Sequence, residues 1–383
     1  MTGRTDGQPP LPSTPLDLRA SIPALQETTY FNFGAHGPSP THVVEAAESF
    51  LRRHEFETPA SGDPYDAASQ AFERTREAVA SFVGADSDEI ALTESTTAGV
   101  NAVAGAIDWT PGDVVVRTDL EHPAGILPWQ RLESEGVEVR VVETDDGRLD
   151  PDRFAEAVAG ADLACFSAVT WTHGTHLPVA DLVETAHEAG ALALVDAVQV
   201  PGHLPSAFAD WNADFVAAAG HKWLLGTWGG GFLYADADVA SDLRPRAVGY
   251  RSVEKPTADR FTFAPAARRF EVGSANPATH VALRAAIEGV EAVGVEAIES
   301  RVLELAGRLA DGVPDDRLLS PATPESGLVT VEVEDPEATV ERLAAAGIVV
   351  RSLPFPDAVR ASVHAVNTAE EVDRLESALR EEW

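Results

Sequence analysis

Lysine is nearly absent from this chain: only Lys222 and Lys255 occur among 383 residues, and arginine supplies the rest of the 28 basic residues. Lys255 lies in a polar stretch typical of a surface, whereas Lys222 lies in the apolar run 216–225, where a solubilising charge is least expected. Arginine cannot form a Schiff base, because its guanidinium stays protonated and delocalised. A desolvated lysine amine can. Lys222 is therefore the first candidate for covalent chemistry.

Cysteine is even scarcer than lysine. The single cysteine, Cys165, excludes an intrachain disulfide and a cysteine metal cluster, and we predict no metal site. Cys165 lies in the apolar run 163–169, which is typical of a buried strand. This setting favours packing as a small apolar side chain over a reactive thiol.

Positive charge is also scarce, with 62 acidic residues, 28 basic residues and a net charge of −34. This balance argues against a nucleic-acid partner, which needs a basic face. No apolar run approaches the roughly 18 residues of a membrane span, and the N-terminus lacks a signal pattern. We therefore expect no membrane partner and a soluble, cytoplasmic protein. Spread acidity with little lysine also suggests a halophilic type of surface, because salt screens self-repulsion.

Short apolar runs alternate with amphipathic helical patterns from residue 89 onward. The runs predicted as strands are 89–93, 113–118, 137–143, 162–169, 191–196, 214–219 and 231–235. Near-continuous apolar strands separated by helices predict an α/β fold, with a mostly parallel seven-stranded sheet that carries helices on both faces. Ligands of such sheets bind at the carboxyl ends of the strands.

The pattern changes after about residue 250. The later elements predicted are a long helical stretch, 279–311, strands at 327–334, 349–353 and 360–366, and helices at 336–346 and 369–382. This order is typical of a smaller α+β unit. We therefore expect a flexible N-terminal segment (1–25), a large domain (26–255) and a small C-terminal domain (256–383).

An acid and an amine follow neighbouring strands of the predicted sheet. Asp196 ends the run 191–196, and Lys222 follows the next run, about 26 residues later. An aspartate alone would be read as a turn or cap residue, but adjacent strand ends deliver both groups to one crevice. The motif Asp-x-x-Gln-x-x-Gly-His-x-Pro from Asp196, followed by Gly-His-Lys-Trp around Lys222, resembles the class V aminotransferases. These fold-type I pyridoxal-phosphate enzymes include cysteine desulfurases and isopenicillin N epimerase-like proteins, and the resemblance covers roughly residues 28 to 380.

The resemblance implies pyridoxal 5'-phosphate as cofactor and assigns it four residues. Lys222 would hold it as an internal aldimine and later move the α-proton. Asp196 would pair with the pyridine nitrogen and keep the ring cationic, which stabilises a carbanion at Cα. Gln199 would donate to the phenolic oxygen. His122, in the Glu-His-Pro segment after the strand that ends near residue 119, would stack on the ring. Lys222, Asp196 and His122 are thus the expected catalytic residues.

A phosphate site is predicted at residues 93–101, where the chain passes from a strand into the start of a helix. The free N–H groups and the dipole of a helix N-terminus attract anions. The resemblance assigns the phosphate to Ser95, Thr96 and Thr97, with Ser95 in place of the relatives' glycine. An ordinary Ser/Thr N-cap is the alternative. Many relatives have a serine where this chain has Ala219, so His221 would carry more of the contact.

Further residues are assigned by the same resemblance. Ser274, in Arg-Phe-Glu-x-Gly-Ser, would reach the phosphate of a neighbouring subunit, which implies a homodimer; a turn or cap role weighs equally. Arg360 would bind the substrate carboxylate through its planar fork. Asn32 and Gly34 would line the substrate side. Trp171 replaces an asparagine of the desulfurases, which suggests a substrate with an apolar side chain or simple loop packing.

The reaction follows less directly from the residues. Residues 351–359 contain no cysteine, although desulfurases carry a nucleophilic cysteine in the corresponding loop, so a persulfide-forming desulfurase is disfavoured. We expect an aminotransferase with a small-molecule amino-acid substrate, with a C–S or C–Se lyase or an amino-acid epimerase as alternatives. A non-catalytic nucleotide-binding or interaction protein is an alternative of another class. It would leave Lys222 unexplained, and the chain lacks Gly-x-Gly-x-x-Gly after a first strand.

Overall fold

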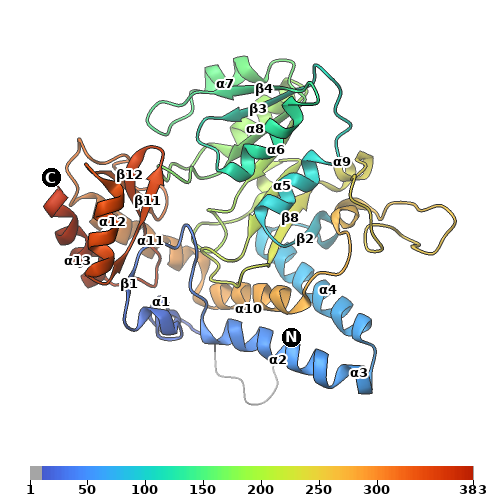
Figure 1. Ribbon diagram of the computed structural model, residues 1–383, viewed down its shortest axis with the longest axis horizontal. Helices are drawn as coiled ribbons and strands as arrows, with labels where there is room; N and C mark the ends of the chain where they lie inside the picture. The colour runs from blue at the N-terminus through green and yellow to red at the C-terminus, as the bar shows by residue number, and fades with distance from the viewer. Residues whose placement is uncertain (1–10, 383) are drawn as a thin grey trace.

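A central seven-stranded sheet organises the computed structural model, which describes residues 11–382 (Figure 1). Its strands are β2 (Ile90–Thr93), β3 (Val114–Thr118), β4 (Glu138–Val142), β5 (Leu163–Ser167), β6 (Leu192–Asp196), β7 (Phe215–Ala219) and β8 (Gly231–Ala235). The spatial order is β2-β8-β7-β6-β5-β3-β4, and β8 runs in the opposite direction to the other six strands. The predicted mostly parallel α/β fold is confirmed.

Helices cover both faces of this sheet. Alternate residues of a strand point to opposite faces, so β5 sends Ala164 and Phe166 to one side and Leu163 and Cys165 to the other. One face packs against α4, α7, α8 and α10, and the other against α5, α6 and α9. Their bounds are α4 (Pro64–Val83), α5 (Thr96–Ala104), α6 (Leu127–Glu133), α7 (Pro151–Val158), α8 (Val179–Glu188), α9 (Ala237–Asp242) and α10 (Pro277–Val293).

The N-terminal segment differs from the expected flexible extension over its described part. Residues 1–10 lie outside the described residues, but α1 (Pro15–Ala20) and the short helix after it bury Leu18, Ile22 and Leu25 in the main core. Three apolar side chains spaced by three or four residues explain this docking. Next follow β1 (Thr29–Tyr30), α2 (Thr41–Phe56) and α3 (Thr58–Ser61).

A smaller layered unit lies beside the central sheet in Figure 1. It contains the antiparallel sheet β11-β12-β9, and its core includes Leu305, Val331, Leu343 and Leu375. A parallel pair, β1 with β10, ties the N-terminal segment to it. The elements are α11 (Val295–Ala310), β9 (Leu328–Glu332), α12 (Pro336–Ala345), β10 (Ile348–Val349), β11 (Arg351–Pro354), β12 (Asp357–Ser362) and α13 (Ala369–Leu379).

Two predicted elements of this unit are corrected by the structure. The helical stretch 279–311 is two helices, because Gly294 between them has a φ of 94°, which ends a right-handed helix. The strand expected at 360–366 is β12 and ends at Ser362, because the chain then turns and the Asn367 side chain accepts a hydrogen bond from the His364 N–H (3.0 Å).

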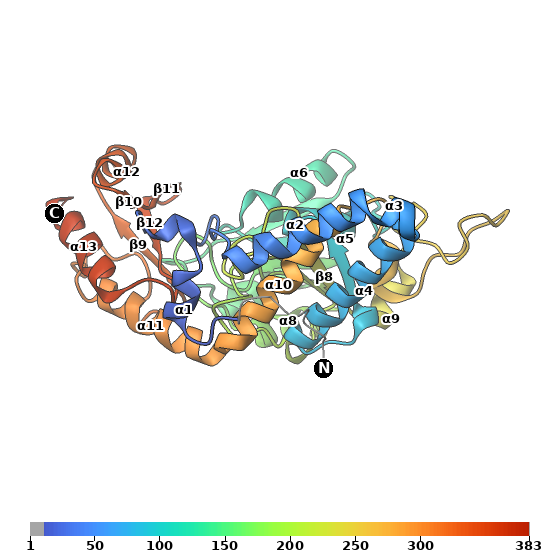
Figure 2. The same ribbon diagram turned by 90° about the horizontal axis from the view of Figure 1, so that it is seen from below.

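The packing of α10 bears on the domain division. This helix packs against α2 and α4, which precede the central sheet in the chain. The boundary at residue 255 therefore stays a prediction. Between α9 and α10 the chain forms an arm, closed by backbone hydrogen bonds from Glu254 to Thr262 and from Ala264 to Ser252, that projects from the body in Figure 2. Within residues 11–382, no helix combines the length and apolarity that crossing a membrane requires.

Candidate active site

A cavity of about 310 Å³ lies at the carboxyl ends of β5, β6 and β7. Among the residues predicted for the site, those that line it are Gly34, Ser95, Thr96, Thr97, His122, Trp171, Asp196, Gln199, His221, Lys222 and Arg360. The two that do not are Asn32 and Ser274. The structure thus brings together side chains from distant parts of the sequence, as the strand-end argument predicts.

Lys222 and Asp196 form the polar centre of this cavity. Asp196 ends β6 with 4% of its surface exposed, and its Oδ1 accepts a hydrogen bond from the Val198 N–H (3.0 Å). Burial raises the pKa of Asp196, and the positive charge of Lys222 opposes that rise. Burial lowers the pKa of Lys222 to about 7, and Asp196 opposes the effect while Arg360 and Arg351 add to it. A large fraction of the amine is therefore neutral, hence nucleophilic, near neutral pH.

The backbone around Lys222 is held by the N-terminal segment. The Gly37 N–H donates to the His221 carbonyl (2.8 Å). A Cβ atom at Gly37 would lie 2.0 Å from the Lys222 carbonyl oxygen, so only glycine permits this approach.

His122 lines the same cavity and contacts an aromatic ring. Its Nδ1 accepts a hydrogen bond from the Ala124 N–H (3.2 Å), and its ring meets that of Trp171 edge to face, with centroids 5.3 Å apart. Burial lowers the pKa of His122 to about 4, helped by the charges of Lys222, Arg351 and Arg360. The imidazole is therefore neutral at pH 7 and suited to stacking on a cationic ring.

The start of α5 offers an anion site. Ser95 is the N-cap, and its Oγ accepts a hydrogen bond from the Ala98 N–H (3.1 Å), so the capping alternative holds for that hydroxyl. The Thr96 Oγ1 is buried and has no hydrogen-bond partner in the described structure. The free N–H groups of the first turn and this hydroxyl match the needs of a phosphate. His221 lies beside them, and its ring stacks on Trp228 with centroids 4.2 Å apart.

Gln199 lines the cavity, and both the nitrogen and the oxygen of its side-chain amide form hydrogen bonds within the protein. Its Nε2 donates to the Gly34 carbonyl (3.0 Å), and its Oε1 accepts from the Trp223 Nε1 (2.7 Å). Its predicted donation to a cofactor oxygen stays a prediction. Asn32 instead forms an isolated bridge with Ser362 next to the cavity.

Arg360 is a buried cation without a carboxylate partner in the described structure. Only 1% of its surface is exposed, and its Nη1 donates to the Trp171 carbonyl (2.6 Å). Its Nε and Nη2 have no hydrogen-bond partner there. Burial, and then the charge of Arg351, lower the pKa of Arg360 to about 9. A Cβ at Gly34 would lie 3.1 Å from Nη2, so this glycine leaves the fork accessible to a planar anion.

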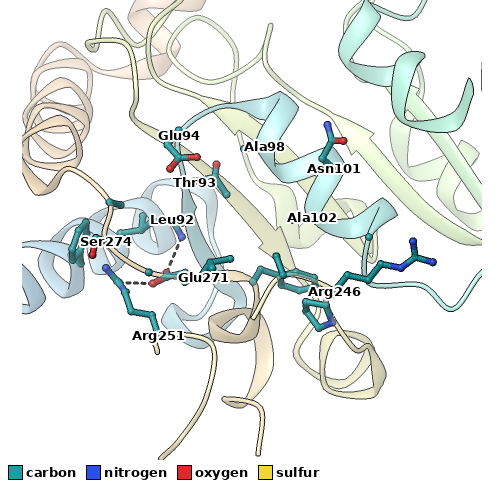
Figure 3. Close-up of a pocket in the computed structure, with 18 of the residues that line it drawn as sticks. Leu92, Thr93, Glu94, Ala98, Asn101, Ala102, Arg246, Arg251, Glu271 and Ser274 are labelled. Carbon is teal, nitrogen blue, oxygen red and sulfur yellow. Dashed lines mark hydrogen bonds and ion pairs between the residues drawn. The ribbon is translucent and has the colours of Figure 1, made fainter. Parts of the chain in front are cut away.

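Ser274 borders a second cavity, of about 590 Å³ (Figure 3). The first turn of α5 faces the Lys222 cavity, whereas Ala98, Asn101 and Ala102 of the same helix line the second one. The Ser274 Oγ is 3.4 Å from the Tyr250 hydroxyl. Within one chain Ser274 thus lies across α5 from Lys222, and its role in a neighbouring subunit stays a prediction.

Three residues at the site were not singled out by sequence reasoning. Arg351 and Trp228 line the cavity, and both come from segments without a motif. Glu121 is buried beside His122 and accepts hydrogen bonds from the Thr118 and Ser167 hydroxyls (2.7 Å each). Burial raises the pKa of Glu121 to about 7. Its position next to His122 in the Glu-His-Pro segment is the sequence feature from which Glu121 could have been predicted as a site residue.

Comparisons with known proteins give a consistent result. The family model described as aminotransferase class-V matches residues 29–375. A protein named probable cysteine desulfurase from Methanothermobacter thermautotrophicus is 33% identical, and the match covers 95% of this chain and 97% of the relative. The apo structure of a cysteine desulfurase from Thermococcus onnurineus superposes with a TM-score of 0.88 at 29% identity, covering 98% of each chain.

A second structural relative carries the cofactor. It is a lysine mutant of C-DES with glycine covalently linked to pyridoxal phosphate, with a TM-score of 0.90 at 28% identity over 95% of this chain and 99% of that one. C-DES is also described as a cystine C–S lyase, in complex with its product cysteine persulfide. The residues of the present cavity fit pyridoxal phosphate: an amine of lowered pKa at Lys222, a buried carboxylate at Asp196 and an unpartnered hydroxyl at Thr96.

Proposed function

Since the chain belongs to the aminotransferase class-V family and is a pyridoxal-phosphate-dependent enzyme, we propose that it is a C–S lyase acting on a sulfur-containing amino acid. The sulfur product would leave directly, without a persulfide on the protein. The aminotransferase expected from the sequence is the second candidate. The names of the relatives favour sulfur chemistry over transamination.

The surroundings of Cys165 carry this proposal. This sole cysteine is 0% exposed and lies in β5, on the sheet face covered by α5 and α6. Burial raises the pKa of its thiol well above the usual value. A persulfide-forming desulfurase needs an accessible thiolate near the substrate. The strands β11 and β12, which bring Arg351 and Arg360 to the cavity, contain no cysteine.

Each residue of the cavity has a distinct role in the proposed reaction. Arg360 would bind the substrate carboxylate, and the neutral His122 ring would help to hold the cofactor. The Lys222 amine would remove the Cα proton, and Asp196 would hold the proton on the pyridine nitrogen. Pyridoxal phosphate supplies the electron sink that makes this proton acidic. The C–S bond then breaks with its electron pair on sulfur, so that L-cysteine and water give pyruvate, ammonia and hydrogen sulfide.

Product analysis tests the proposal. With L-cysteine or L-cystine, the loaded enzyme should form pyruvate in proportion to the sulfur released. Cys165→Ala should keep this activity, whereas Lys222→Ala should lose both the activity and the visible absorption of the lysine-bound cofactor. Alanine as the product, with loss of activity in Cys165→Ala, would instead show a desulfurase. A keto acid that forms only when an amino-group acceptor is present would show an aminotransferase. Recovery of the D-amino acid carrying deuterium from a deuterated solvent would show an epimerase.

A further inference from the structure

A buried carboxyl group that the proposed reaction does not use lies directly before His122 in the chain. Glu121 has 3% of its surface exposed and follows β3, whereas His122 lines the Lys222 cavity. The short helical turn 123–125 packs on this carboxyl group, because a Cβ atom at Gly125 would lie 3.3 Å from the Glu121 Oε2. Glu121 is therefore enclosed by the same turn that His122 caps.

Three hydrogen bonds fix the carboxyl group of Glu121 to the ends of two neighbouring strands. Its Oε1 accepts from the Thr118 hydroxyl at the end of β3 (2.7 Å) and from the Ser167 N–H at the end of β5 (3.1 Å). Its Oε2 accepts from the Ser167 hydroxyl (2.7 Å). Ser167 is in turn the register partner of Asp196 at the end of β6. Through one residue, the carboxyl group thus connects the turn that holds His122 with the strand end that holds Asp196.

These hydrogen bonds do not by themselves require an ionisable group. A glutamine has the same shape, its oxygen can accept from Thr118 and from the Ser167 N–H, and its amide can donate to the Ser167 hydroxyl. Burying a carboxylate costs more free energy than burying a neutral amide. Burial raises the pKa of Glu121 to about 7, the two hydroxyl donors oppose that rise, and Asp196 adds to it. The carboxyl group is therefore less favourable for folding than an amide, and its charge points to a role in the site.

The ionisable groups around Glu121 leave its charge without a cationic partner in the described structure. All three of its hydrogen bonds come from neutral groups. Asp196 of β6 is acidic, the Cys165 thiol of β5 has a raised pKa, and His122 is neutral at pH 7. Arg117 of β3 donates to a backbone carbonyl. Helix α5, which packs on the turn, contains no ionisable residue, and those of α6 are exposed. A protonated cofactor ring held by Asp196 would supply positive charge on this side of the cavity.

We propose that Glu121 is a positioning residue for the cofactor, which fixes His122 and Asp196 relative to each other and whose carboxylate favours the protonated form of the lysine-bound cofactor. The carboxylate acts through its charge and through Ser167, and it does not contact the substrate. The inference depends on pyridoxal phosphate as the cofactor but not on C–S lyase chemistry. Measurements without substrate therefore test it separately from the proposed function.

Two variants separate the effect of position from the effect of charge. Glu121→Ala removes the hydrogen bonds and the charge, whereas Glu121→Gln keeps the shape and the hydrogen bonds and removes only the charge. Loaded Glu121→Ala should lose most of the visible circular dichroism of the bound cofactor and bind it about tenfold more weakly, and Glu121→Gln should keep both properties. In both variants the midpoint of the pH titration of the cofactor absorbance should fall by about half a unit to one unit, because a nearby negative charge stabilises the protonated form.

Asp214→Asn is the matched control for lost stability. Asp214 is also a buried carboxyl group, with 6% of its surface exposed, and it accepts from the Ala193 N–H (2.6 Å). It precedes β7 and so lies at the opposite edge of the sheet from Lys222. Urea unfolding of the cofactor-free proteins should show a loss of stability in Asp214→Asn, while its circular dichroism and absorbance titration match those of the wild type.

Three results would overturn the inference. The first is a Glu121→Gln protein whose absorbance titrates as the wild type does, and the second is a Glu121→Ala protein with unchanged circular dichroism and cofactor affinity. The third is an equal spectral change in Asp214→Asn, because the change would then follow from lost stability alone. If Glu121→Ala fails to fold, the Glu121→Gln titration decides. Absence of pyruvate from L-cysteine would refute the lyase proposal and leave these spectra as expected.

Discussion

Replacing Arg360 with methionine should stabilise the substrate-free protein while it removes substrate binding. The guanidinium is 1% exposed, lacks a carboxylate partner among the described residues and has a pKa lowered to about 9. Methionine fills a similar elongated volume with apolar atoms. A buried ionic group is often less favourable for folding than a well-packed apolar side chain. Arg360 would thus be kept for function at the expense of stability.

The size of the effect follows from the pKa. Lowering it from 12.5 to about 9 corresponds to about 5 kcal/mol against the charged form in the folded protein. Because the folded-state pKa lies below the unfolded one, this penalty is complete below pH 9 and shrinks as the pH rises toward 12.5. The variant also loses the hydrogen bond to the Trp171 carbonyl, which costs about 1–3 kcal/mol when that oxygen stays unpaired. We therefore expect a net gain of about 2–4 kcal/mol in the free energy of unfolding at neutral pH.

Urea unfolding of the cofactor-free protein at constant salt measures this gain. The partly exposed Arg301→Met variant is the control and should change the unfolding free energy by less than about 0.5 kcal/mol. A saturating substrate analogue such as L-2-aminoadipate should stabilise the loaded wild type and leave loaded Arg360→Met unaffected, because a ligand stabilises only the state that binds it. An Arg360→Met protein less stable than the wild type would refute the reasoning, since the arginine would then be stabilising without any substrate.

Three further outcomes follow from other groups. Burial lowers the pKa of Lys222 to about 7, so the rate at which cofactor-free protein captures pyridoxal phosphate should rise with pH through about 7 and then level off. Stopped-flow absorbance would show this, and a flat profile would contradict it. Thr96→Val should weaken cofactor binding about tenfold in a fluorescence titration, because it removes an unpartnered hydroxyl at the start of α5, whereas Thr185→Val on α8 should not. Glu271→Gln should lower the free energy of unfolding by about 3–5 kcal/mol, because it removes the buried counter-charge that Arg76 and Arg251 share and leaves Arg76 only the exposed Glu73. The exposed Glu304→Gln is the control, and an equal change in both would count against the argument.

The sheet and the centre of the site could be predicted because each depends on local patterns. Apolar runs predicted the strands, and a polar residue at a strand end predicted which side chains meet, as for Asp196 and Lys222. Thr96 followed from a strand that leads directly into a helix. These features need only neighbouring residues and the known handedness of parallel sheets.

Other features depend on contacts that no local pattern encodes. The pairing of Arg351 with Arg360 is set by the register of a hairpin, and the sequence did not reveal that the expected strand 349–353 is interrupted at Val350. The two hydrogen bonds of Gln199 involve Gly34 and Trp223, which are far apart along the chain. The break at Gly294 was missed because apolar periodicity continues on both sides of it.

The connection from β1 to Gly37 sets a fixed length between two parts of the molecule. Thr29 pairs with Ile348, Asn32 bridges Ser362, and the Gly37 N–H donates to the carbonyl of His221, the residue before Lys222. Because the numbers of residues between these contacts are fixed, the segment sets the distance between Lys222 and the β11–β12 hairpin, which carries Arg360. We expect the segment to tolerate no insertion or deletion, because one residue more or less would shift Lys222 relative to Arg360, and to tolerate substitution only away from its glycines and the fully buried Phe31 and Phe33.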